Sequence, residues 1–306
     1  MREYRFAVAT ASSTFVLLVI GGLVHATGSS LACPDWPLCY GQLFPRMEGG
    51  VFFEHGHRLV AGTVAVLTGL MAVLVFRRRR ERTVRALSVL AVGLVLVQAT
   101  LGGLTVIYKL PLLVSAAHLA TSMGFFSTVI YLAHRLRPME LPRADPAPRG
   151  LVGAAALATY LQIVLGAFVR HTGAAMACGA GALCEGALWP PPGPGQLNMA
   201  HRLAGVALGV LVTFAAVRPA RDALRARHGV RAVLALAAPV LVVAQLALGL
   251  LTVATYISIS VVSLHLATGA LLLADLLALF LSLGGQRASD ATARRGAVPG
   301  LAPAAG

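Results

Sequence analysis

The sequence contains eight stretches of mostly apolar residues, and each is long enough to cross a membrane as a helix. A membrane-spanning helix needs about 20 consecutive apolar residues. Of the 306 residues, 58% are hydrophobic and 12% are charged, and a soluble domain of this length could not enclose so much apolar surface. We therefore expect an all-α integral membrane protein with spans at residues 6–25, 57–76, 87–107, 112–134, 151–170, 201–217, 232–254 and 257–283.

The basic residues predict how these spans are oriented. Lys and Arg number 25 against 11 Asp and Glu, which gives a formal net charge of +14. Most of the basic residues precede the first span, follow the last, or lie in the loops after the second, fourth and sixth spans. By the positive-inside rule, this multi-pass protein of the cell membrane then has both termini in the cytoplasm. The charge indicates anionic membrane lipid as the partner of these loops, and no nucleic-acid partner is expected.

All four cysteines fall in loops on the opposite, outer side of the predicted membrane. Cys33 and Cys39 lie in the first outer loop, and Cys178 and Cys184 lie in the third. Because the outer compartment is oxidising, we expect the disulfides Cys33–Cys39 and Cys178–Cys184. Four free thiols without a role are the alternative. A zinc site is disfavoured, since neither pair has the two-residue spacing usual for zinc.

The second half of the sequence repeats the first at an offset of about 145 residues. Residues 21–28 match residues 166–173, His57-Arg58-Leu59 recurs at 201–203, and the two cysteine pairs correspond at the same offset. Pairs in which Gln precedes Gly by four residues also recur, and we assign them to helix packing because Gln can bond across helices. These pairs begin at Gln98, Gln162 and Gln245.

The repeat predicts the architecture. Each copy contains four helices, so both copies have the same orientation and are related by an axis along the membrane normal. We therefore expect two parallel-repeated four-helix bundles, joined by a cytoplasmic linker and followed by a disordered cytoplasmic tail. The boundaries are 1–138 and 150–284 for the bundles, 139–149 for the linker and 285–306 for the tail.

The repeat also selects four of the nine histidines, which are His57, His118, His201 and His265. Each lies roughly 26 to 30 Å from the cytoplasmic edge of its span at 1.5 Å per residue, so all four share one level near the outer face. Two imidazoles facing each other in an apolar bundle core can ligate the iron of one haem. A bare transition-metal site would leave most coordination positions empty. For any single ring, a buried histidine satisfied by a polar neighbour is the alternative.

The two copies differ at Glu54, three residues before His57, where the second copy has Asn198. A carboxylate beside a haem ligand can act as a base or stabilise positive charge, whereas an amide cannot take a proton. The first half is therefore predicted to be reactive and the second to hold a cofactor. The alternative is that Glu54 only caps its helix. His25 and Arg170 occupy equivalent outer ends of two spans, where a cation could bind a haem propionate.

Taken together, these segments resemble the bacterial haem A synthase family over nearly the whole span region. The resemblance rests on Gly21-Gly22-Leu23-Val24, Thr27-Gly28, Cys-Pro-Asp-Trp-Pro-Leu-Cys at 33–39, Glu54-His55-Gly56-His57-Arg58, His118, His201-Arg202 and His265. It implies a membrane oxidoreductase that converts the C8 methyl of haem O to a formyl group, through hydroxymethyl haem, for cytochrome oxidase.

The resemblance further implies the roles of the site residues. Glu54, His57 and His118 would form the catalytic site for haem O, and His201 and His265 would bind a haem b prosthetic group, with all four histidines as axial iron ligands. Haem O synthase and an electron acceptor, either a quinone or a redox protein, are implied partners. The family usually has Arg at the position of His25, so the propionate role is not carried over there.

Two other classes of function fit the same pattern. A dihaem b-type electron carrier, or a quinone oxidoreductase subunit, would only pass electrons and would not need Glu54. A haem transporter or chaperone would bind haem without altering it.

Overall fold

The computed structural model describes residues 1–138 and 144–284, and the long secondary-structure elements in these two ranges are all helices. All eight long helices have the length and apolar composition needed to span a membrane. The predicted tail and residues 139–143 of the predicted linker lie outside the described residues. The helices are α1 (Arg2–Ala26), α2 (Gly49–Arg78), α3 (Arg82–Ile107), α4 (Leu112–Leu136), α5 (Arg149–His171), α6 (Pro194–Arg225), α7 (Gly229–Ala254) and α8 (Ile259–Ser282), with a short 3-10 helix at Ala174–Met176.

The eight predicted spans correspond to the eight helices, but two of the predicted spans are too short. Helix α2 begins at Gly49 rather than at residue 57, and α6 covers Pro194–Arg225 rather than 201–217. The predicted spans end where polar residues interrupt the apolar run, because they were defined by hydropathy. Backbone hydrogen bonding in a helix does not require apolar side chains, so both helices continue beyond the apolar layer.

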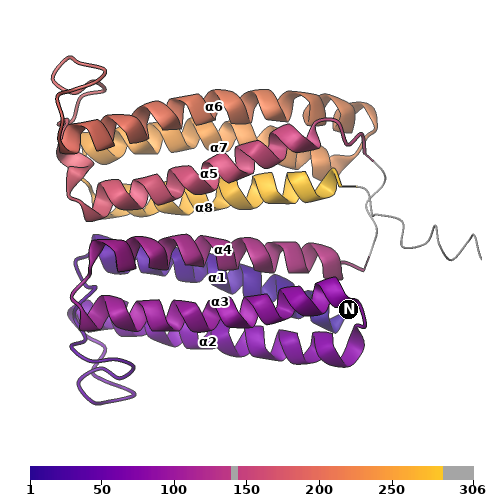
Figure 1. Cartoon of the computed structure of the whole chain (residues 1–306), viewed down its shortest axis with the longest axis horizontal. Helices are drawn as coiled ribbons and strands as arrows, with labels where there is room; N and C mark the ends of the chain where they lie inside the picture. The colour runs from indigo at the N-terminus through magenta and orange to yellow at the C-terminus, as the bar shows by residue number, and fades with distance from the viewer. Residues whose placement is uncertain (139–143, 285–306) are drawn as a thin grey trace, which may run out of the picture.

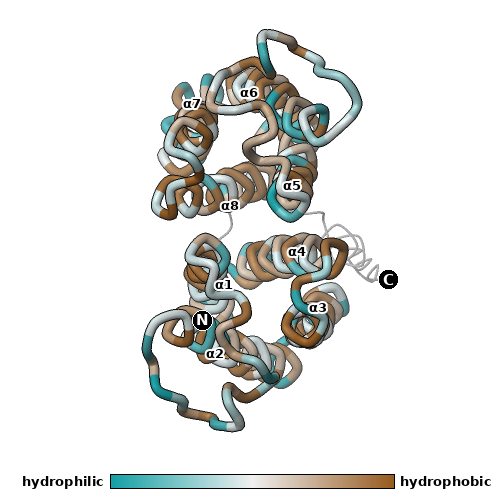
Figure 2. The backbone as a smooth tube through the Cα atoms, turned by 90° about the vertical axis from the view of Figure 1, so that its left-hand side faces the viewer, coloured by the Kyte–Doolittle hydropathy of each residue, from teal (hydrophilic) through white to brown (hydrophobic). Residues whose placement is uncertain are grey.

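The helices form two sets of four, α1–α4 and α5–α8, which lie side by side (Figure 1). Within each set, consecutive helices pack on one another and the last helix packs on the first, so the four close into a ring, as the end view shows (Figure 2). In such a ring α2 lies across from α4, and α6 lies across from α8. Contacts between the two sets come mainly from α1, α4, α5 and α8.

The two sets share a buried apolar layer. Leu18, Met123, Phe126, Ala270 and Leu273 form one cluster of buried side chains contributed by α1, α4 and α8. The hydroxyl of Tyr160 on α5 donates a hydrogen bond of 3.1 Å to the carbonyl of Ala120 on α4. Close packing of these side chains and the interhelical hydrogen bond hold the two sets against each other.

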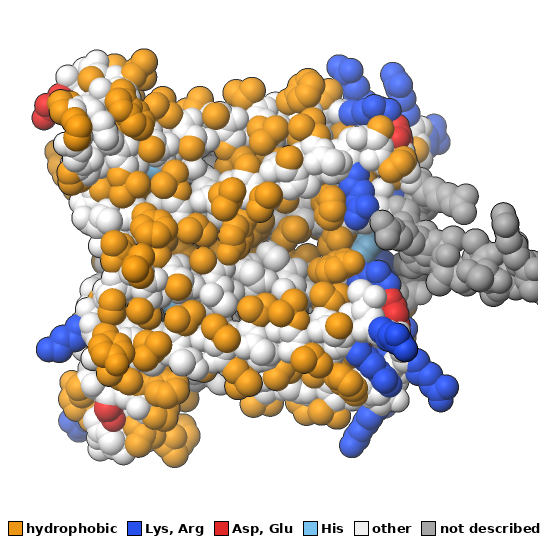
Figure 3. Space-filling view, viewed as in Figure 1, with side chains coloured by type: hydrophobic (Ala, Val, Ile, Leu, Met, Phe, Trp, Pro, Cys, Tyr) orange, Lys and Arg blue, Asp and Glu red, His pale blue; other side chains and the backbone are white. Residues whose placement is uncertain are grey.

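The two ends of the molecule carry different side chains. Lys and Arg side chains gather at one end, which we call the arginine end (Figure 3). The opposite end, the disulfide end, carries the loops 27–48 and 172–193, which contain all four cysteines. Between the two ends, large apolar side chains point outward from the helices, as expected for a surface that faces lipid. Examples are Val66, Leu96, Val210, Phe214 and Val240, with exposed fractions of 62 to 70%.

Candidate functional site

Each of the four predicted histidines lies against a glycine of the neighbouring helix. A Cβ atom built on the glycine would approach the imidazole Cε1 to 3.1 Å for Gly21 and His57, 3.4 Å for Gly102 and His118, 3.0 Å for Gly166 and His201, and 3.3 Å for Gly249 and His265. These distances are at or below the limit of ordinary carbon contacts. The glycines therefore leave the space that the rings occupy.

The structure brings the histidines together in two pairs, one in each set of helices. The first set carries His57 on α2 and His118 on α4, and the second set carries His201 on α6 and His265 on α8. In each pair, the two rings come from helices that face each other across the ring of four. The Nδ1 atoms of His57, His118 and His265 are buried and have no hydrogen-bond partner among the described residues.

Two glutamines bond to histidine segments of the neighbouring helix and a third packs beside one, as expected for cross-helix packing. The side-chain amide of Gln98 donates to the carbonyl of His118 at 3.0 Å. The Gln162 amide donates to the carbonyl of His201 at 2.7 Å and lies 3.1 Å from Nδ1 of the same residue. The third, Gln245, packs on α8 one turn beyond its histidine, at Gly269.

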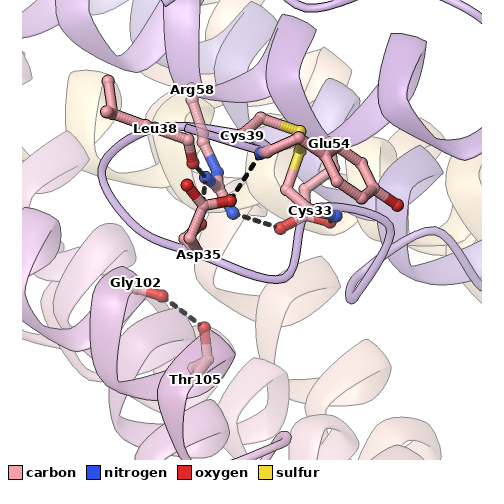
Figure 4. Close-up of polar contacts among 9 residues, drawn as sticks. Cys33, Asp35, Leu38, Cys39, Glu54, Arg58, Gly102 and Thr105 are labelled. Carbon is pink, nitrogen blue, oxygen red and sulfur yellow. Dashed lines mark hydrogen bonds and ion pairs between the residues drawn. A yellow bond between two sulfur atoms is a disulfide. The ribbon is translucent and has the colours of Figure 1, made fainter. Parts of the chain in front are cut away.

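Glu54 is buried and bound through both carboxylate oxygens (Figure 4). Oε1 accepts a hydrogen bond of 2.5 Å from Arg58 Nη2 in an ion pair, and Oε2 accepts one of 2.8 Å from the backbone N–H of Cys33. The hypothesis that Glu54 caps its helix is wrong. Helix α2 begins at Gly49 with Glu48 as the N-cap residue, so Glu54 lies in the second turn. It ties α2 to the disulfide loop instead.

Two residues beside the predicted site also hold this loop, and the sequence analysis did not assign them a role. Arg58 Nη1 donates to the carbonyl of Asp35 at 2.7 Å and to the carbonyl of Leu38 (Figure 4). The Nε2 atom of His55 lies 2.8 Å from the carbonyl of Leu43. The signal in the sequence was that both residues belong to the segment Glu54-His55-Gly56-His57-Arg58, which carries the family resemblance.

The loop itself is closed by the first of the two expected disulfides, both of which are present. The S–S distances are 2.02 Å for Cys33–Cys39 and 2.09 Å for Cys178–Cys184. From the first loop, Trp36 reaches across to α3, where a Cβ on Gly103 would be 2.8 Å from the indole ring. The loop therefore contacts both α2 and α3 at the disulfide end.

Asp35 organises the turn of this loop. Its carboxylate accepts hydrogen bonds from the backbone N–H groups of Gly41 at 2.8 Å and Tyr40 at 2.6 Å. These two bonds, that from Gly41 above all, hold the pKa of the Asp35 carboxyl below its usual range. The turn is thus stabilised by the ionised form of an exposed side chain.

The second loop is held without a carboxylate. The side-chain amide of Asn198 donates to the carbonyls of Ala174 and Ala175, each at 2.8 Å. Arg202 donates to carbonyls of residues 179, 181 and 182, and it pairs with no carboxylate in the part of the chain that the structure describes. Met199 takes the place that corresponds to His55 and packs on the second disulfide.

His25 and Arg170 also meet, together with a residue that the sequence analysis did not single out. The rings of His25 and His171 are in contact, with centroids 4.8 Å apart. Arg170 Nη2 donates to the carbonyl of His25 at 3.4 Å, and His25 Nδ1 lies 3.3 Å from the hydroxyl of Ser30. The ends of α1 and α5 therefore touch at the disulfide end.

Comparison with known proteins identifies the family. The model of the COX15-CtaA family, described as cytochrome oxidase assembly protein, matches residues 4–51 and 48–279. The chain belongs to the COX15-CtaA family. This match covers all eight helices and both histidine pairs.

Relatives in the COX15-CtaA family carry the name Heme A synthase. The protein of Shouchella clausii is 33% identical over 264 residues, which are 82% of this chain and 87% of that protein. The protein of Staphylococcus saprophyticus is 32% identical over 291 residues, 90% of this chain and 93% of that protein. The protein of Symbiobacterium thermophilum is 36% identical over 223 residues, 67% of this chain and 72% of that protein.

Proposed function

We propose that this COX15-CtaA family member is a haem A synthase, which oxidises the C8 methyl of haem O to a formyl group through hydroxymethyl haem. One observation carries the proposal beyond the names of the relatives. A buried carboxylate, Glu54, lies one turn before His57 in one histidine pair, whereas the amide of Asn198 lies at the same place beside the other pair. Only one of the two pairs is therefore equipped for chemistry.

The orientation in the membrane follows from the arginine end. We infer that this end faces the cytoplasm of the cell, with both termini, and that the disulfide loops face the oxidising outer side. Anionic lipid headgroups then lie beside the loops that are rich in arginine.

The two sets of helices are proposed to be parallel repeats, with domains at 1–138 and 150–284. Matching backbone geometry at corresponding turns supports this. Gly28 and Gly173 have φ values of 69° and 72°, and Tyr40 and Glu185 have φ values of 53° and 51°. Because left-handed conformations are uncommon outside glycine, their recurrence at matched positions favours a common fold for the two halves.

The residues present fit haem in both halves. Each pair offers two imidazoles from facing helices, the glycines leave the rings their space, and three of the four Nδ1 atoms are buried without a partner among the described residues. His201 and His265 would hold haem b, which supplies one-electron redox chemistry when bound. His57 and His118 would bind the iron of the substrate haem O.

Within the first half, Glu54 is proposed to stabilise the positive charge that develops as the methyl carbon is oxidised. Arg58 and the Cys33 N–H fix the direction of its carboxylate, so no reorganisation is needed when the charge appears. The loop that carries Trp36 lies over the ends of α2 and α3 and limits access of water from the outer side. Haem O synthase is the proposed source of the substrate, and a quinone or redox protein is the proposed electron acceptor.

The proposal is tested by expressing the full chain together with a source of haem O and analysing the extracted haems by mass spectrometry. We expect hydroxymethyl and formyl products from the unaltered protein. Glu54→Gln keeps the size of the side chain but removes its charge, so products should fall roughly 100-fold while the haem content stays constant. Glu48→Gln is the matched control, because this exposed N-cap residue makes no side-chain capping bond.

The same experiment separates the competing functions. A folded, haem-loaded protein that yields no oxidised haem would contradict the synthase and favour a dihaem electron carrier or a haem transporter. Equal product from Glu54→Gln and Glu48→Gln would contradict the role of Glu54.

A further inference from the structure

The first disulfide lies beside an imidazole. The sulfur atoms of Cys33 and Cys39 and a ring nitrogen of His55 all lie within 4.8 Å of one another, and all three residues are buried. In residues 1–138 and 144–284, no other group of three or more histidine, cysteine or acidic side chains converges as closely. The disulfide is drawn in Figure 4. The proposed haem chemistry uses none of these three side chains.

The hydrogen bonds of His55 leave one ring nitrogen for a ligand. Nε2 lies 2.8 Å from the carbonyl oxygen of Leu43, and a carbonyl can only accept, so Nε2 carries the hydrogen. The neutral ring then has its lone pair at Nδ1, which is buried and has no hydrogen-bond partner among the described residues. Histidines that ligate metals typically donate their other N–H to a carbonyl in this way. His55 is therefore oriented as a metal ligand would be.

Reduction of the disulfide completes a set of metal donors. Two thiolates and one imidazole form one of the donor sets that proteins use for Zn²⁺, with water as the fourth ligand. Around a tetrahedral zinc ion such donors lie roughly 3.5 to 3.8 Å apart. The two sulfur atoms separate when their bond opens, and the imidazole is already within 4.8 Å of both. Only small shifts are then needed to enclose an ion.

The spacing of the cysteines in the sequence does not argue against this site. Cys33 and Cys39 are six positions apart rather than at the short spacing usual for zinc, but the third donor comes from α2. The bonds of Glu54 and Arg58 to the loop bring this helix to the cysteines. The donor set is therefore assembled by the fold and not by the local sequence.

The second loop has the same disulfide with a different neighbour. Met199 occupies the place that corresponds to His55, and it packs on Cys178 and Cys184. The side chains that bind Zn²⁺ in proteins are those of cysteine, histidine and the acidic residues, and methionine is not among them. The two loops therefore form a matched pair in which the first has an imidazole donor and the second has a thioether.

We propose that the first loop, in its dithiol form, binds a thiophilic divalent cation of the Zn²⁺ type through Cys33, Cys39 and His55. The dithiol form exists before the thiols are oxidised. It returns when an external dithiol passes two electrons and two protons to the cysteines and itself becomes a disulfide. Zn²⁺ then displaces the two thiol protons. Because one ligand belongs to α2, the ion holds the loop on this helix while the S–S bond is open. This inference goes beyond the proposed function and does not depend on it.

The test uses the full-length, haem-loaded protein with both disulfides opened by a phosphine reductant, and Zn²⁺ is the probe. The cysteines are alkylated with and without Zn²⁺, and mass spectrometry gives the rate at each position. Zn²⁺ should slow alkylation of Cys33 and Cys39 roughly tenfold or more, because the ion engages the thiolate electron pairs that would attack the reagent. The rates at Cys178 and Cys184 should not change.

Exchanging the neighbours of the two disulfides tests the role of the imidazole. His55→Met should abolish the protection of the first cysteine pair, and Met199→His should create protection of the second pair. His171→Met is the matched control, because it removes an imidazole from the same end of the molecule but outside the cluster. It should leave the protection unchanged. The haem content of each variant checks its fold.

Two results would overturn the inference. One is that Zn²⁺ protects both cysteine pairs of the unaltered protein equally, or protects neither. The other is that folded His55→Met keeps the full protection of Cys33 and Cys39. Both results leave the proposed haem A production standing, because that activity is measured in the protein with its disulfides intact.

Discussion

The two loops at the disulfide end are held against their helices by different chemistry. In the first half, Glu54 and Arg58 form a buried ion pair within α2, and both bind backbone groups of the loop. In the second half, the amide of Asn198 and the apolar side chain of Met199 do the equivalent work. A buried ion pair generally adds little net stability compared with well-packed neutral groups. The second half therefore shows that the fold does not need the carboxylate, which points to a functional reason for Glu54.

The largest expected difference between the halves concerns the resident haem b that we propose for the second half. His201→Ala removes a ligand of the proposed haem b, so purified protein should lose nearly all of its tightly bound haem. His57→Ala alters only the proposed substrate site, and the resident haem should remain. Both variants are checked by the ratio of haem to protein. The haem is quantified from the absorption of its pyridine complex. Equal loss from the two would contradict the division of labour between the halves.

A second difference should appear in the stability of the two loops. Arg58→Met leaves the buried carboxylate of Glu54 without its counter-charge, and breaking a buried ion pair in this way costs about 3 to 5 kcal/mol. Arg202→Met removes only hydrogen bonds to backbone carbonyls. These bonds are exposed, so water can replace the lost donor, and the whole change should cost about 1 kcal/mol.

The rate at which a reductant opens each disulfide measures these losses, because the four sulfur-bearing residues are at most 5% exposed. Arg58→Met should speed reduction of Cys33–Cys39 roughly 100-fold, well beyond the effect of Arg202→Met on Cys178–Cys184. Similar accelerations of the two reductions would show that Glu54 is not stabilised by its charge partner.

The features that the sequence predicted are those that depend on local pattern. Eight apolar runs predicted eight helices, and the repeat marked both histidine pairs and the exchange of Glu54 for Asn198. The hydrogen bond from Arg58 to the carbonyl of Asp35 was not predictable, because the two residues are far apart in sequence and turns determine the path of the loop. The early start of α2 was missed since hydropathy does not detect polar helical turns.

A third, smaller difference should follow from enlarging the glycines that face the histidines. Gly166→Ala places a methyl group 3.0 Å from His201 Cε1, so the ring must shift, and affinity for the resident haem should fall about tenfold. Gly21→Ala acts in the same way on His57 and should weaken only the binding of added haem O.

Gly69→Ala provides the control for this series, because a Cβ at that helical position meets nothing within 4 Å. Each of the three variants is titrated with haem, and the change in absorbance gives its affinity for haem. If Gly21→Ala released the resident haem, the assignment of haem b to the second half would be wrong.

The smallest expected difference is a pH response confined to the first loop. The pKa of Asp35 is lowered by the N–H groups of Gly41 and Tyr40, so its contribution to loop stability is present above the unfolded pKa of about 3.8. That contribution is lost as the pH falls through the lower pKa of the folded state. Protection of the Tyr40 and Gly41 amides from hydrogen exchange should therefore decline in acid.

The second loop has Ala180 at the position that corresponds to Asp35, so its amides should keep their protection over the same pH range. Asp35→Asn should remove the pH response, and an equal decline in both loops would show that it arises elsewhere.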